Sequence, residues 1–214
     1  MTALQHPSFR LALGGLLPVV IIGGFWLPYL SFMAPLVMLS GLAISARKGR
    51  WVCGNACPRG AFFDRIMQRF GRHKKLPPLL KKTATRWSVV LFLMSFMTYR
   101  LIPNVASLDH WAHVFWQMCV ITSAFGIALA LLYFPRAWCS LCPMGTMQAK
   151  IGGKKQPIQF EGSACKMCGK CEKSCPMNLP IIDHKERGQL ENPDCIKCGK
   201  CITACPLSLL KKAT

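Results

Sequence analysis

Two short stretches decide the fold of the C-terminal part of the chain. Residues 165–176 read CKMCGKCEKSCP, and residues 195–206 read CIKCGKCITACP. Each stretch has three cysteines at every third position and a fourth cysteine four residues later, directly before a proline. Thiols at such short and regular intervals are typical of metal ligation, because cysteines that only pack into a core need no fixed spacing.

The spacing C-x2-C-x2-C-x3-C-P is the one with which bacterial ferredoxins bind two 4Fe–4S clusters, and the fourth cysteine of each stretch ligates the other cluster. The sequence therefore predicts two clusters with crossed ligation. The first cluster is assigned to Cys165, Cys168, Cys171 and Cys205, and the second to Cys195, Cys198, Cys201 and Cys175. A zinc ribbon is disfavoured, since it gives no reason for eight thiolates in two matching runs.

A second, weaker repeat holds four more cysteines. Residues 50–60 read RWVCGNACPRG and residues 136–145 read RAWCSLCPMG. The favoured interpretation is that both pairs converge on one iron–sulfur or metal site, formed by Cys53, Cys57, Cys139 and Cys142. A reversible disulfide and a purely structural turn stay open as alternatives. Cys119 stands alone in an apolar stretch and is predicted to be a packing residue.

The N-terminal part has the composition of a membrane protein, since 52% of the chain is hydrophobic and only 16% is charged. Apolar segments predict four transmembrane helices arranged as two hairpins, each followed by one cysteine–proline turn. The second segment is short, which leaves one broken or re-entrant segment as an alternative for the first pair. The predicted segments are 9–27, 31–44, 87–102 and 114–133.

The acidic residues are unevenly distributed: six of the eight follow residue 160. This change of composition predicts a domain boundary near the Gly-Gly-Lys-Lys sequence at 152–155. The predicted fold is an α-helical membrane domain over residues 1–155 and an α+β ferredoxin-like domain over residues 156–214. The ferredoxin-like domain has a small apolar content, so much of its stability is expected to come from its clusters.

The net charge of +19 is concentrated in one loop, because twelve Lys and Arg residues lie between Arg47 and Arg86 and only Asp64 opposes them. Positive loops remain in the cytoplasm. Four spans would then place both chain ends in the cytoplasm of a bacterium or archaeon, with residues 103–113 on the periplasmic side. No nucleic-acid recognition motif accompanies the charge, so it indicates a lipid surface and not a nucleic acid.

Three local expectations follow. An amphipathic helix is predicted over residues 62–70, lying on the lipid surface or packing on the ferredoxin-like domain. A small β-hairpin is predicted from residues 179–183 and 189–192. His110 and His113 are predicted to lie in an interfacial loop, with a quinol or haem site as the alternative.

Lysines surround the predicted cluster ligands and are expected to be solvated, where they would steer an acidic redox partner. They are Lys166, Lys170, Lys173, Lys197 and Lys200.

With both repeats in view, residues 9–210 resemble the NapH/MauN-type membrane ferredoxins, and are similar to the C-terminal part of NosR and the core of the CcoG/RdxA group. One difference is that Cys139 and Cys142 are separated by two residues, where the family has three. The resemblance implies electron transfer between the quinone pool, or a cytoplasmic donor, and a partner reductase or maturation system. It leaves the terminal acceptor open.

The predicted function is therefore that of a membrane electron-transfer subunit with no bond-making catalysis by side chains. Two rivals remain. One is a metal-handling or assembly factor, such as a cupric reductase for oxidase maturation. The other is a passive membrane anchor of a redox complex.

Overall fold

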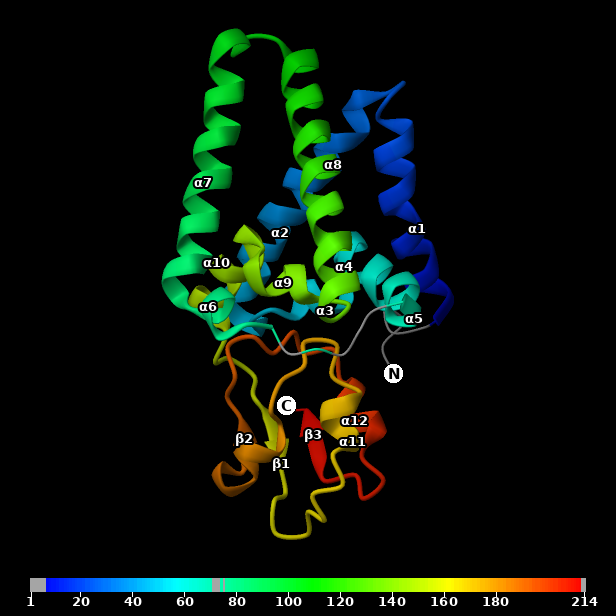
Figure 1. The fold of residues 1–214 in the computed structure, drawn as a ribbon, viewed down its shortest axis with the longest axis vertical. Helices are drawn as coiled ribbons and strands as arrows, with labels where there is room; N and C mark the ends of the chain where they lie inside the picture. Colours follow the sequence, from blue (N-terminus) through cyan, green and yellow to red (C-terminus); the bar gives the residue numbers. More distant parts are fainter. Residues whose placement is uncertain (1–6, 71–73, 75, 213–214) are drawn as a thin grey trace.

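The computed structural model describes residues 7–70, 74 and 76–212. Four long helices stand over a smaller part that carries the strands, and short helices form a layer between the two (Figure 1). The long helices are α1 (Pro7–Gly23), α2 (Met33–Lys48), α7 (Thr83–Leu101) and α8 (Leu108–Leu132). The terminal residues of the two predicted domains, 1–6 and 213–214, lie outside the described residues.

Two helices of the described chain are long and apolar enough to cross a membrane. One is α8, and the other is α2 together with the 3₁₀ turn η2 (Pro28–Phe32) that precedes it. Helix α1 is apolar but shorter. Four spans therefore stay a prediction.

Helix α8 begins six residues earlier than expected, at Leu108. Ser107 caps it by accepting a hydrogen bond from the backbone N–H of His110, and Asp109 in the first turn suits the positive end of the helix dipole. His110 and His113 are therefore helical, and the prediction of a loop through residue 113 was wrong. The short turn η4 (Ile102–Asn104) ends α7 before this cap.

The two cysteine–proline turns begin and end several helices of the short-helix layer. Pro58 and Pro143 each occupy the start of a helix, where a missing N–H has no cost. The elements are α3 (Trp51–Asn55), α4 (Pro58–Phe62), the π-helical turn η3 (Phe63–Met67), α5 (Gln68–Phe70), α6 (Pro78–Lys81), α9 (Ala137–Leu141) and α10 (Pro143–Gly152).

The amphipathic stretch at 62–70 spans α4, η3 and α5. Phe63 and Met67 are buried in a cluster with Ala130 of α8 and Trp138 of α9. The buried face thus packs on the helical part, which corrects the alternative that it packs on the ferredoxin-like part. Ile66 and Phe70 are exposed.

The C-terminal part is built on a small antiparallel sheet with strand order β2-β1-β3. The strands are β1 (Ile158–Phe160), β2 (Gln189–Leu190) and β3 (Leu210–Lys212). Residues 182–187 form the 3₁₀ segment η5, and Leu190 pairs with Ile158. The predicted hairpin was therefore wrong, because β2 pairs with a strand that precedes the first cysteine run.

Candidate iron–sulfur sites

The two cysteine runs have the same backbone conformation. Met167 and Lys197 have φ of 50° and 54°, and the glycines two residues later, Gly169 and Gly199, have φ of 72° and 76°. Left-handed residues next to right-handed ones turn successive N–H groups toward one side, which makes a concave site for an anionic group. Each loop ends in a short helix, α11 (Lys170–Lys173) or α12 (Lys200–Ala204).

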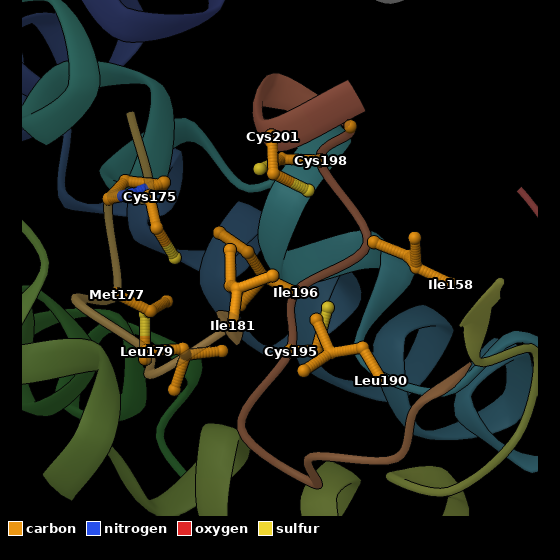
Figure 2. Close-up of a pocket in the computed structure, with 12 residues that line it drawn as sticks. Ile158, Cys175, Met177, Leu179, Ile181, Leu190, Cys195, Ile196, Cys198 and Cys201 are labelled. Carbon is orange, nitrogen blue, oxygen red and sulfur yellow. The ribbon is translucent and has the colours of Figure 1, made fainter. Parts of the chain in front are cut away.

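One cavity brings together the four cysteines predicted to hold the second cluster. Figure 2 shows Cys175, Cys195, Cys198 and Cys201 around this cavity, whose walls also include apolar side chains such as Ile181. Cys175 thus lies with three cysteines of the other run, as crossed ligation requires. Four thiols in an apolar pocket are a donor set that suits an iron–sulfur cluster.

Burial dominates the chemistry of these thiols. It raises the pKa of Cys175 to about 11, and it raises the pKa of Cys201 above the usual range, with neighbouring thiols adding to the shift. One charged group beside them lacks a partner within the described chain, since Lys197 is only 7% exposed and its Nζ donates to no described atom. Lys197 is therefore not the solvated lysine that the sequence predicted.

The first predicted cluster has a more open site. Burial raises the pKa of Cys171, and the nearby thiol of Cys165 adds to the shift. Cys165, Cys171 and Cys205 all pack against the same apolar core, whereas Cys168 is exposed. Ligation of this cluster by Cys205 stays a prediction.

The four remaining paired cysteines lie in the layer of short helices, and the structure brings the two pairs together. Burial raises the pKa of Cys53 to about 12; Arg50 opposes this shift, and the other three thiols of the group add to it. Cys139 behaves likewise, with a pKa raised to about 11. The Cys53 thiol also donates a hydrogen bond of 3.0 Å to Oε1 of Gln148.

The arginine of each turn reaches into the other turn. Arg50 Nη2 donates to the carbonyl oxygen of Cys139 at 2.7 Å, and Arg136 Nη1 donates to that of Cys53 at 2.6 Å. Both arginines are fully buried. The repeat of the sequence is thus a repeat of structure, in which two similar turns interlock.

The glycine that ends each turn makes room for this exchange. A Cβ at Gly60 would lie 2.8 Å from Arg136 Nη1, and one at Gly145 would lie 2.6 Å from Arg50 Nη2. Both positions therefore need a residue without a side chain.

Two carboxylates hold these arginines, of which Asp64 is buried and Asp194 is half-buried. Asp64 accepts two hydrogen bonds from Arg136, at 2.8 and 2.9 Å, and one from Arg10 at 2.6 Å. Burial alone would raise the pKa of Asp64, but the surrounding cations, Arg136 foremost, lower it to about 2. Lys200 of α12 lies 3.5 Å away and links the carboxylate to the ferredoxin-like part.

The second carboxylate, Asp194, directly precedes a cysteine of the second run. It pairs with Arg50 at 2.9 Å and with Arg86 of α7 at 2.6 and 2.8 Å. The two ion networks therefore join α1 and α7 to the C-terminal part, and each contains more cations than carboxylates.

The layer of short helices touches the second cysteine run. A Cβ at Gly54 would lie 2.0 Å from the carbonyl oxygen of Ile196, so α3 and this loop are in backbone contact. Cys53 and Cys139 also pack against the core of the C-terminal part. The thiols of Cys53 and Cys139 therefore lie against the apolar core that lines the cavity of the second cluster.

No three His, Cys, Asp or Glu side chains in the described ranges lie as close together as the ligands of a single metal ion. A four-iron cluster holds each thiolate on a different iron atom, so its ligands stand further apart than those of one ion.

The sequence missed the residues that hold the turns in place, namely Arg10, Arg86 and Asp194. Asp64 did carry a signal, because it is the single acid among twelve cations. Arg50 and Arg136 occupy equivalent positions of the repeat, and this equivalence was visible without the structure.

Comparisons with known proteins agree with the motifs. Residues 157–206 match the family model described as "4Fe-4S dicluster domain". Residues 30–77 and 116–159 match a second model, described as "4Fe-4S binding domain", and these ranges contain both cysteine–proline turns. The prediction of two 4Fe–4S clusters is confirmed. The chain is a two-cluster iron–sulfur protein.

A relative from Escherichia coli (strain K12), named "Putative electron transport protein YccM", is 25% identical over 177 residues. The match covers 72% of this chain and 49% of the relative, so the chain spans about half the length of the curated protein it matches. No solved structure matches the chain. The comparisons support an iron–sulfur electron-transport class, and they do not single out the NapH/MauN type.

Proposed function

We propose that the chain is a membrane-bound electron-transfer protein. Its four long helices anchor the clusters at the cytoplasmic face, and the chain moves electrons between the quinone pool, or a cytoplasmic donor, and a partner reductase or maturation system. The observation that carries this proposal is the direct contact between the helical layer and the loop of the second cluster. When bound, a 4Fe–4S cluster takes up and gives off single electrons.

The surface of the long helices supports the membrane anchor. Large apolar side chains are exposed on all four, and a patch of this extent is rare on a protein that is surrounded by water. Examples are Ile22 on α1, Leu39 on α2, Leu91 and Phe92 on α7, and Phe125 on α8. The 19 residues of α7 extend for about 28 Å, close to the thickness of the hydrocarbon core.

The ends of the helices differ as a bilayer orientation requires. Arg47 and Lys48 end α2, whereas Trp26 and Tyr29 lie at the opposite tip, where the Tyr29 hydroxyl bonds Asp109. Basic residues favour the cytoplasmic side and aromatic rings favour the interface. Reporter fusions after Arg86 and at the end of the chain should therefore give cytoplasmic signals, and a fusion near Ser107 should give a periplasmic one. A periplasmic signal from the chain end would overturn the four-span arrangement.

The chain itself determines the surroundings of the clusters. The wall around Cys175 and the second run is apolar, and the left-handed loop has the backbone conformation whose N–H groups would face a bound cluster. Burial and hydrogen bonds to sulfur are the means by which a protein sets the potential of a cluster.

Serine variants test the crossed ligation. Cys165→Ser and Cys205→Ser should alter the electron paramagnetic resonance signal of one cluster, while Cys175→Ser should alter that of the other. Cys119→Ser is the matched control, because that thiol lies on α8 and packs against Leu17 and Val20 of α1. If Cys205→Ser and Cys175→Ser alter the same cluster, the assignment fails.

Reconstitution in vesicles distinguishes electron transfer from the rival metal-handling function. In vesicles that contain a quinol, the proposal expects reduction of the clusters at a rate that does not depend on copper. Reduction of copper(II) by the chain, with no electron exchange with quinol or with a reductase, would favour the metal-handling function.

A further inference from the structure

The four cysteines of the membrane turns all lie in the layer of short helices and share the same degree of burial. Each of the four is half-buried, while neighbours in the chain such as Val52, Gly54, Ser140 and Pro143 are buried. Cys53 and Cys139 pack against the core of the C-terminal part, and the Cys53 thiol donates a hydrogen bond to Oε1 of Gln148.

Three hydrogen-bond donors in the same turns lack an acceptor among the described residues. They are Arg50 Nε, Trp138 Nε1 and Thr146 Oγ1, all with their polar atoms out of contact with solvent. Donors buried without a partner are costly, and protein interiors rarely keep them. A ligand with several acceptor atoms, such as the sulfides of an iron–sulfur cluster, would accept hydrogen bonds from these donors.

The charge around the thiols also favours a negatively charged ligand. Asp194 faces Arg50 and Arg86, and Asp64 faces Arg136, Arg10 and Lys200. Two carboxylates thus stand against five cations. Arg50 and Arg136 are the fully buried cations, and a buried positive charge is unfavourable unless a negative group offsets it. Four thiolates that bind an iron–sulfur core carry a net negative charge.

We infer that Cys53, Cys57, Cys139 and Cys142 ligate a third iron–sulfur cluster, whose negative charge is offset by the buried Arg50 and Arg136. The inference deepens the proposed function and rests on it only for the role of the site, since metal content tests the site by itself. The site lies between the membrane helices and the second cluster, which makes it the point where electrons pass from one part to the other.

Two positioning roles follow for the arginines. Each guanidinium fixes the carbonyl of a cysteine in the opposite turn, and each brings a positive charge close to the thiols. A charge of this kind favours the more negative, reduced form of a cluster. Arg136→Met or Arg50→Met should therefore lower the potential of the third cluster, whereas Arg→Lys at either position should restore most of it.

The test is the iron and acid-labile sulfide content of the full chain, purified in detergent without oxygen. We expect about twelve irons per chain, from three clusters of four. The double variant with Cys53→Ser and Cys139→Ser should keep about eight, together with the unchanged resonance signals of the two ferredoxin-type clusters. A second double variant, with Cys57→Ser and Cys142→Ser, should give the same result, and Cys119→Ser should keep about twelve.

Retained signals of the two other clusters show that a variant is folded, so a loss of four irons then belongs to the third site. About eight irons in the unaltered chain, with the four thiols alkylated only after reduction, would overturn the inference in favour of a disulfide. About eight irons with all four thiols freely alkylated would also overturn it, and would leave the turns a structural role. Either result would leave the proposed electron transfer through the two other clusters intact.

Discussion

The two cysteine runs share their spacing and their backbone but differ in what surrounds them. In the first run Lys166, Met167 and Cys168 are all exposed, and Met167 is 59% exposed. In the second run the equivalent Ile196 and Lys197 are buried, against the layer of short helices. One site thus faces solvent and the other faces the helical part, so in the electron transfer proposed above the pair would form a route with an inner and an outer end.

The residue that precedes each run shows how this difference arises. Ala164 stands before the first run and is exposed, whereas Asp194 stands before the second and pairs with Arg50 and Arg86. Asp194 therefore gives the second loop an ionic anchor to the helical part. The asymmetry of the route lies in a few residues outside the ligands.

The largest effect is expected from removal of this anchor. Asp194→Ala makes the second run resemble the first and leaves the fully buried Arg50 without its carboxylate, which should destabilise the protein by about 3–5 kcal/mol. Thermal unfolding in detergent measures this loss. Glu161→Gln is the control, because the 3.8 Å pair of Glu161 with Lys211 is largely exposed and contributes less than about 1 kcal/mol. Equal effects of the two variants would mean that Asp194 is not an anchor.

A smaller loss is expected where α3 meets the second run. Gly54→Ala would place a methyl group 2.0 Å from the carbonyl oxygen of Ile196 and should cost about 1–3 kcal/mol by forcing the loop away. The resonance signal of the second cluster should change, and that of the first should not. Gly15→Ala is the matched control on α1, because a Cβ there has no neighbour within 4 Å. A Gly54→Ala protein with both signals unaltered would contradict the contact.

The sequence predicts the parts of this arrangement that depend on local spacing. Ligand runs are local, so eight cysteines could be assigned to two clusters without a structure. The start of α8 was missed because Asp109 and His110 interrupt the apolar stretch, although Ser107 is a common capping residue. The hairpin was misplaced because a strand of only two residues, Gln189 and Leu190, carries almost no pattern, and Ile158, the partner of Leu190, lies 32 positions earlier.

Pairings between residues far apart in the sequence cannot be predicted from local spacing. Arg50 and Asp194 are 144 positions apart, and nothing in either neighbourhood identifies the other as its partner. The exposure of a side chain cannot be predicted in this way either, since the five lysines near the clusters have similar sequence surroundings. The structure separates them: Lys197 is buried and Lys200 pairs with Asp64, while Lys166, Lys170 and Lys173 remain exposed.

The smallest expected effect concerns the outer end of the route. Lys166 and Lys170 flank Cys168 in the sequence and are exposed, and Lys185 of η5 lies close to this loop, with its Nζ 3.7 Å from the sulfur of Met167. Asp183 and Glu186 on η5 reduce this positive charge without cancelling it. An acidic redox partner should therefore associate at this face, with a rate that falls as salt increases.

Lys166→Gln with Lys170→Gln should slow association with an acidic flavodoxin, used as the probe, by about 2–10-fold at low salt and leave the rate at high salt unchanged. Stopped-flow mixing of the reduced probe with the full chain measures this rate. Lys212→Gln is the control, because Lys212 lies on β3, which is the edge strand opposite β2. If the control slows association as much as the double variant does, the attraction comes from the overall charge of +19 and not from the face around Cys168. An unchanged rate in both would leave the outer cluster without an electrostatic docking face, and electrons would then have to enter the route from the membrane side.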